Sequence, residues 1–281
     1  MQSPTESSIV KPLKAYKNPD FLNSHDARPI RVLCELTEPE TRLEQEGVKD
    51  TIVMFGSARN ISPEKEEEKL EALGDFSQLD EQARAQCIIR KRQIELSVKY
   101  YREALGLSKK LTETALHLRP EGHDQLFHVC SGGGPGIMEA ANRGAREAGG
   151  KSVALGISLP FEQSLNSYCD EETAFEFHYF FMRKYWFLYH AKALVVFPGG
   201  FGTMDELFEM LTLVQTEKVA KQIPIILYGT EFWHKAVNMS LLVEWGTISP
   251  EDLGLFRFAD DIDTAHEYIM RHFKPFEAKK A

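Results

Sequence analysis

Two carboxylates directly follow a glycine-rich loop in the segment VVFPGGFGTMDELFE, residues 195–209. A glycine loop between an apolar strand and a helix commonly binds a phosphate through its free N–H groups. Asp205 and Glu206 would repel that phosphate, so they must face another part of the ligand. A ribose fits, because its hydroxyls donate hydrogen bonds and because breaking its C1′–N bond builds positive charge on the sugar. Glu206 could stabilise that charge or orient a water molecule.

A structural interpretation of Glu206 is equally open. The residues from Thr203 to Glu206 match the capping box T-x-x-E, with Thr203 as the N-cap of the following helix. The carboxylate would then close the first helical turn while staying beside the loop. In either case the helix N-terminus would favour the ionised form, which suits a charge stabiliser or a base better than an acid.

A second glycine loop lies in SGGGPGIMEAA, residues 131–141, where Gly133 and Gly134 allow close approach of a ligand and Pro135 or Gly136 would open a helix. Neither loop has the G-x-G-x-x-G spacing of a dinucleotide fingerprint or the terminal Gly-Lys-Ser/Thr of a P-loop. An NAD enzyme and a P-loop NTPase are therefore not expected. Two such loops, each between a strand and a helix, favour a phosphate site.

A third segment, FHYFFMRKYWFLYHA at 177–191, places Arg183 and Lys184 side by side within a run of aromatic residues. Buried cations need partners, and a phosphate together with Glu206 would supply them. Most of the rings are expected in the core. One helix nevertheless carries more aromatic surface here than one face can bury, and aromatic residues and Arg are enriched in interfaces. We therefore expect a homodimer or a higher homo-oligomer.

Short apolar runs alternate with helical patterns along the chain, which is typical of βαβ units. Five runs are expected as strands: 51–58, 125–134, 152–160, 192–200 and 223–229. This pattern predicts an α/β, Rossmann-like doubly wound parallel sheet with helices on both faces. Its ligands would bind at the carboxyl ends of the strands, where the glycines lie. We expect an irregular N-terminal arm over 1–28 and a single domain over 29–281, with a helical segment at 59–118.

The composition narrows the class of protein. The net charge of −9 argues against nucleic-acid binding, which requires a basic face. The four cysteines have no CxxC spacing and favour free thiols in a reducing compartment over a metal site. The polar N-terminus lacks the apolar region of a secretory signal, and no apolar run has the roughly 18 residues of a membrane span. We expect a cytoplasmic protein without membrane contact, metal or cofactor.

The motifs GGGPGIMEAA, MRK and PGGFGTMDE, in this order, resemble the Lonely Guy (LOG) family, whose hallmark is PGGxGTxxE. Members often carry the label "lysine decarboxylase-like". The resemblance covers roughly residues 50–260 and implies a Rossmann-like fold, at least a dimer, and hydrolysis of nucleoside 5′-monophosphates of the AMP or cytokinin type to free base and ribose 5-phosphate. It implies that Arg183 and Glu206 are catalytic. The implied substrate-binding residues are Gly133, Gly134, Glu162, Lys184, Gly199, Gly200, Gly202, Thr203, Asp205 and Thr212.

The chain also departs from the short plant-type members of the family. It has a long segment at 59–100, and its first expected strand ends in FGSAR rather than a Cys-Gly-Ser-Ser run. These departures resemble a longer bacterial branch and leave the base unassigned. A different class of function remains open, that of a non-catalytic nucleotide or cofactor carrier of LOG-like fold. A decarboxylase would need pyridoxal phosphate, and no lysine stands out as its attachment point.

Overall fold

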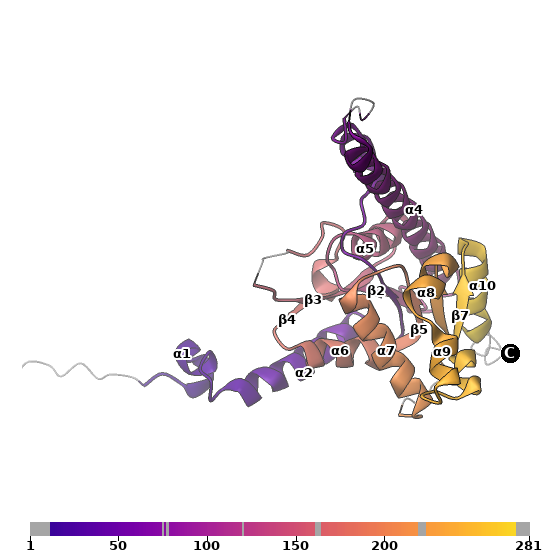
Figure 1. The fold of residues 1–281 in the computed structure, drawn as a ribbon. Helices are drawn as coiled ribbons and strands as arrows, with labels where there is room; N and C mark the ends of the chain where they lie inside the picture. The colour runs from indigo at the N-terminus through magenta and orange to yellow at the C-terminus, as the bar shows by residue number, and fades with distance from the viewer. Residues whose placement is uncertain are drawn as a thin grey trace, which may run out of the picture.

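The computed structural model of the chain describes residues 12–74, 76, 79–119, 121–160, 164–218 and 223–273. Within them, seven parallel strands form one sheet in the order β4-β3-β2-β1-β5-β6-β7 (Figure 1). The strands are β1 Thr51–Phe55, β2 His128–Ser131, β3 Ser152–Ile157, β4 Ala174–Phe177, β5 Ala191–Val196, β6 Ile225–Tyr228 and β7 Phe256–Ala259. The expected doubly wound α/β fold is confirmed.

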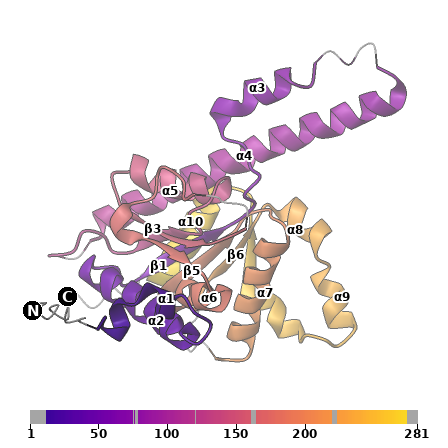
Figure 2. The same ribbon diagram turned by 90° about the vertical axis from the view of Figure 1, so that its left-hand side faces the viewer.

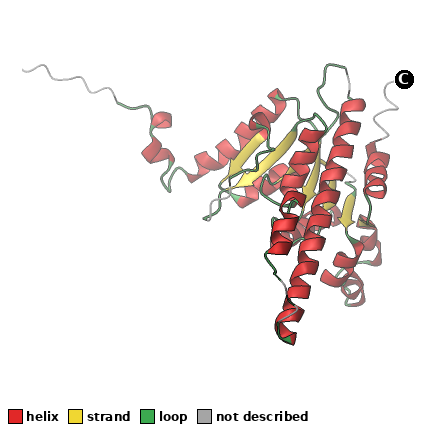
Figure 3. Ribbon diagram, turned by 90° about the horizontal axis from the view of Figure 1, so that it is seen from above, coloured by secondary structure: helices red, strands yellow, loops and turns green. Residues whose placement is uncertain are grey.

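The helices of the described residues are α1 Pro19–Leu22, α2 Arg28–Gln45, α3 Glu66–Glu71, α4 Glu81–His117, α5 Ile137–Glu147, α6 Phe180–Tyr189, α7 Phe201–Gln215, α8 Thr230–Ala236, α9 Met239–Glu244 and α10 Ile262–Phe273. They cover both faces of the sheet (Figure 3). Along β1, Val53 packs into a core with α6 and α7, whereas Ile52 packs into a second core with α4, α5 and α10. Alternate residues of a strand point to opposite faces, so this strand is buried throughout.

Helix α4 is a single continuous helix of 37 residues within the segment expected as one or two helices. Its second half packs along α5, with Tyr101, Leu107 and Leu111 buried. Its first half extends with α3 beyond the body of the molecule (Figure 2). Ile88 and Ile89 are accordingly exposed. The long segment therefore adds a helical projection to the sheet without adding a strand.

Helix α2 joins the N-terminal part of the chain to the site-bearing half. Its Glu35 carboxylate accepts hydrogen bonds from the backbone N–H groups of His178 and Tyr179, at 2.8 and 3.2 Å, where α6 begins. The backbone oxygen of Glu35 accepts another from the Trp186 indole at 2.8 Å. Helix α6 is thus held at two points by α2. Residues 12–27, which lie in the expected arm, include a 3-10 turn at Ala15–Lys17 and the short α1.

None of the helices in the described part of the chain is both long enough and apolar enough to cross a bilayer.

Candidate active site

A cavity of about 800 Å³ opens at the carboxyl ends of β1, β2, β3 and β5. The chain leaves β1 toward β2 on one side and returns through β5 on the other, so the cavity lies where the strand order reverses. Open α/β sheets bind ligands at this position. The wall includes residues from both glycine loops, from α6 and from the start of α7: Gly132, Gly134, Arg183, Gly199, Gly200, Gly202, Thr203, Asp205 and Glu206.

Both glycine loops lead directly into helix N-termini beside this cavity. Helix α5 has Gly136 as its N-cap and α7 has Gly200, and no side chain caps either helix. The first N–H groups of a helix have no partner within the helix. The Ile137 N–H of α5 donates to the Ser57 carbonyl at 3.1 Å, so the donors that α5 can offer lie after its first residue. Two N-termini without a side-chain cap thus present positive dipole ends to one cavity, which favours an anion.

The expectation that Thr203 caps α7 is wrong. The helix begins at Phe201, so Thr203 lies in the third helical position and Glu206 in the second turn. The capping box from Thr203 to Glu206 is therefore not formed. The N-cap is Gly200, so the local T-x-x-E pattern misplaced the start of the helix by three residues.

The two adjacent glycines of this loop differ in what surrounds them. A Cβ at Gly199 would collide with the side chain of Thr203, whereas a Cβ at Gly200 would meet nothing within 4 Å. We expect Gly199→Ala to lower the free energy of unfolding by about 1–3 kcal/mol, as overpacking does. Gly200→Ala is the matched control and should change stability by less than about 0.5 kcal/mol. Denaturant unfolding of both variants measures this, and equal stability of the two would contradict the contact.

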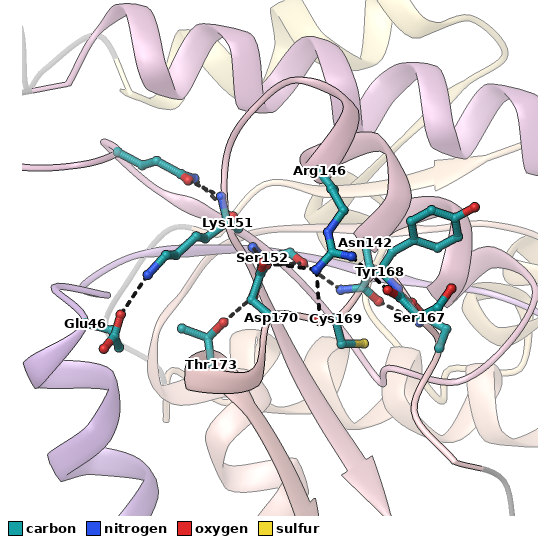
Figure 4. Close-up of polar contacts among 12 residues, drawn as sticks. Glu46, Asn142, Arg146, Lys151, Ser152, Ser167, Tyr168, Cys169, Asp170 and Thr173 are labelled. Carbon is teal, nitrogen blue, oxygen red and sulfur yellow. Dashed lines mark hydrogen bonds and ion pairs between the residues drawn. The ribbon is translucent and has the colours of Figure 1, made fainter.

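The first glycine loop is held in place by a polar network that joins it to β3 and to residues 164–173. Asn166 donates from its side chain to the carbonyl oxygens of Gly133 and Gly134, at 2.9 and 3.0 Å. Asn166 also donates to Asn142, which donates to Ser152. Figure 4 shows how Arg146 and Asp170 continue these contacts around the start of β3. The loop is therefore positioned before any ligand arrives.

Gly133 has a structural place in this loop. Its φ is +68°, and its N–H donates to Ser131 Oγ at 3.0 Å. Its amide is thus used within the protein, and Gly134 rather than Gly133 lines the cavity. Gly136 has a φ of +71°, and a Cβ there would collide with the backbone oxygen of Ser57. Because Gly136 has no side chain, this loop can pack directly against the loop that follows β1.

Arg183 and Glu206 meet in the cavity wall, from α6 and α7. A guanidinium nitrogen of Arg183 lies 3.8 Å from Glu206 Oε1, and the two side chains are 15% and 8% exposed. Phe180 and Phe187 flank the guanidinium, with ring centroids 5.3 and 5.5 Å away. Arg183 Nε is buried without a hydrogen-bond partner among the described residues. A buried donor without a partner is costly, so this group is suited to a ligand.

The protonation of Glu206 differs from the expectation. Burial raises the pKa of its carboxyl to about 7, although Lys184 and Arg183 act in the opposite direction. Burial also lowers the pKa of Arg183. The helix dipole acts mainly within the first turn, and Glu206 lies beyond it. The carboxyl can therefore exchange a proton near neutral pH, which suits an acid as well as a base.

Lys184 is not part of the cavity wall and binds the acids of α7. Its Nζ lies 2.7 Å from Asp205 Oδ2 and 2.6 Å from Glu209 Oε2, and 3.9 Å from Glu206 Oε1. These contacts raise the pKa of Lys184, although its burial acts against them. Lys184 therefore links α6 to α7 through ion pairs and so helps to hold Arg183 and Glu206 in their relative positions.

Two further residues that were expected to bind substrate, Thr212 and Glu162, are not among the described residues of the cavity wall. Thr212 lies exposed farther along α7, and its hydroxyl donates to the Phe208 carbonyl at 2.7 Å. Glu162 lies outside the described residues. The cavity wall also holds Arg59, Met138 and Glu176, which motif reasoning missed. For Arg59 a signal existed, because FGSAR ends an apolar strand in the same way as the two glycine loops.

The protein-family model described as "Possible lysine decarboxylase" matches residues 138–269. The match begins directly after GGGPGI and contains both MRK and PGGFGTMDE. This part of the chain is similar to that family, whose label the LOG-like proteins often carry. The match supports the resemblance drawn from the motifs, and the matched segment contains α6 and α7 with Arg183 and Glu206.

Solved structures are similar to this chain as well. A structural-genomics target designated TM1055 is 18% identical, with 79% of this chain and 99% of that chain covered and a TM-score of 0.44. The Moco carrier protein from Chlamydomonas reinhardtii is 17% identical, with 81% and 99% covered and a TM-score of 0.46. No curated protein matches the sequence.

Proposed function

We propose that this protein hydrolyses the N-glycosidic bond of a nucleoside 5′-monophosphate, of the AMP or cytokinin riboside monophosphate type, to a free base and ribose 5-phosphate. The observation that carries the proposal is the buried Arg183–Glu206 pair in the wall of a cavity with two uncapped helix N-termini. The N-termini supply donors for a phosphate, and the pair supplies an acid–base group and a cation.

In this proposal the 5′-phosphate binds at the start of α7, against the N–H groups that follow Gly199, with the α5 N-terminus opposite. Glu206 lies one and a half turns into α7, which is too deep for the phosphate and suits the ribose. Arg183 Nε, which has no protein partner among the described residues, donates to the nucleotide. The like-charge conflict between phosphate and carboxylate is avoided because the two contact different parts of the ligand.

The reaction adds water across the C1′–N bond. As that bond breaks, its electron pair moves to the base nitrogen, and the sugar gains positive charge that the Glu206 carboxylate stabilises. A water oxygen then bonds to C1′, and Glu206 accepts the proton that this water loses. With a pKa of about 7, Glu206 can pass that proton on to the departing base.

The test is incubation with AMP followed by chromatography for free adenine and an assay for ribose 5-phosphate. Release of both in equal amounts supports the proposal. Tight AMP binding without base release would instead favour a nucleotide carrier. The name of the family model supplies a third activity, but no lysine lines the cavity among the described residues. Lys184 is engaged by carboxylates, so a Schiff-base lysine is lacking there.

We also propose that the protein is a homodimer through the aromatic surface of α6 and the start of α7. The side chains exposed there are Phe180 at 50%, Phe181 at 53%, Tyr185 at 40%, Tyr189 at 46% and Phe201 at 96%. Exposed apolar surface of this extent marks an interface. Phe180 and Phe201 also line the cavity, which brings the site next to the proposed interface.

Phe181→Glu should therefore dissociate the dimer and lower activity, because it places a charge in an apolar contact. Ile89→Glu is the matched control, since Ile89 is 58% exposed on the projecting part of α4 and should leave the dimer intact. Size-exclusion chromatography with light scattering measures the mass of both variants. A fully active monomer of the unmodified protein at micromolar concentration would refute the interface.

A further inference from the structure

A second cavity of about 990 Å³ adjoins the first. The two share Ser57, Arg59 and Gly199 in their walls, so they meet beside the loop that precedes α7. The rest of the second cavity is built mainly by α8 and by one stretch of α4, which includes Arg90, Gln93, Ser97 and Tyr100. The long helical segment, which the proposed function leaves unused, therefore forms one side of this second cavity.

Helix α4 also fixes the junction between the two cavities. Ser97 Oγ accepts a hydrogen bond from the Ile61 N–H at 2.7 Å, and the Ser97 carbonyl accepts one from Asn60 Nδ2, also at 2.7 Å. On its other side the same loop is bound by Ser57, whose N–H donates to the Pro198 carbonyl at 3.1 Å. The backbone that carries Arg59 is therefore held between α4 and the loop before α7.

The two cavities differ in their balance of charges. The first contains three carboxylates, Glu176, Asp205 and Glu206, against Arg183 and the shared Arg59. The second contains Arg59, Arg90 and Lys235 with one carboxylate, Glu231. That carboxylate is already paired, with Lys235 at 2.6 Å and with Arg92 at 3.7 Å.

The two arginines are available for a ligand. Arg90 donates to the neutral Gln93 amide at 3.3 Å, and neither Arg59 nor Arg90 has a carboxylate within 4 Å among the described residues. The second cavity thus presents two uncompensated guanidinium groups, which bind phosphates well.

We propose that the second cavity binds a phosphoryl group attached to the 5′-phosphate, so that the protein accepts nucleoside 5′-diphosphates. This rests on the proposed function, which places the 5′-phosphate at the start of α7 beside Gly199. A second phosphoryl group joined to that phosphate would reach Arg59 at the junction and then Arg90. The long segment at 59–118 would in this way set which nucleotides bind, rather than how the glycosidic bond is broken.

The test compares the binding of ADP and AMP by titration calorimetry in a Glu206→Gln background, so that hydrolysis does not consume the ligands. Arg90 lines only the second cavity. Arg90→Ala should weaken ADP binding about tenfold, as expected for a lost charge-assisted hydrogen bond, and change AMP binding less than twofold. Arg84→Ala, on the same helix and outside both cavities, is the matched control and should change neither.

A second variant, Lys235→Ala, removes another cation of this cavity from α8 and should also weaken ADP selectively. If circular dichroism shows that Arg90→Ala is unfolded, Lys235→Ala still tests the inference. Unchanged ADP binding in both variants, or an equal loss for ADP and AMP, would overturn the inference. Base release from AMP by the unmodified protein is measured separately, so a failure of the proposed function is recognised on its own.

Discussion

Glu206→Gln is expected to abolish base release from AMP while nucleotide binding remains. Glutamine keeps the shape of the side chain and can still contact the ribose, but it can neither accept the proton of the attacking water nor balance the charge on the sugar. Loss of a general acid–base group typically costs about 10²–10⁴-fold in rate. The turnover number for adenine release measures the loss, and calorimetry with AMP measures the binding that should persist.

The same residue predicts a pH profile. Because burial raises the pKa of Glu206 to about 7, the carboxylate that acts as base is lost as the pH falls through that value. We expect kcat/KM of the unmodified protein to decline about tenfold per pH unit below about 7. Any residual activity of the Gln variant should not show this decline at low pH. Near-normal turnover in Glu206→Gln would show that the carboxyl serves the fold alone.

Adenosine is expected to be a far poorer substrate than AMP, although the bond to be broken is the same. The N-termini of α7 and α5 have no side-chain cap, and the phosphate of AMP can use their N–H groups whereas adenosine cannot. Hydrogen bonds to a charged group contribute about 1.5–3 kcal/mol each, so two of them are worth roughly 10²–10⁴ in kcat/KM. Binding energy gained away from the reacting bond holds the sugar in place for attack.

Steady-state assays of adenine release with both substrates measure this difference. Ribose 5-phosphate should inhibit competitively, whereas ribose should not, because only the former occupies the proposed phosphate site. Equal values of kcat/KM for adenosine and AMP would mean that the two glycine loops have another purpose.

The central part of the sheet could be predicted from sequence and its edges could not. The five expected strands correspond to β1, β2, β3, β5 and β6, which are apolar because both of their faces are covered. The edge strands β4 and β7 have four residues each, of which only two are buried, so AFEF and FRFA do not stand out. Helix α2 was also missed, because Pro39 lies inside it and proline usually ends a helix.

The site could be predicted as a set of residues but not as a geometry. Adjacent residues on a helix point about 100° apart, so one of Arg183 and Lys184 had to face away, and only packing decides which. Glu206 is expected to be ionised on the premise that Thr203 is the N-cap of α7. The N-cap is Gly200, three residues earlier, so Glu206 lies beyond the reach of the helix dipole and its burial controls its pKa. Local motifs do not contain this information.

The position of β1 also affects how the chain folds as it is synthesised. Strand β1 forms early in the sequence, yet its partner on one side is β5, which starts at Ala191. Until that part of the chain has left the ribosome, one edge of this buried strand has no partner, and an open apolar edge invites aggregation. Substitutions that weaken the β1–β5 pairing should therefore reduce the yield of folded protein during expression before they affect catalysis.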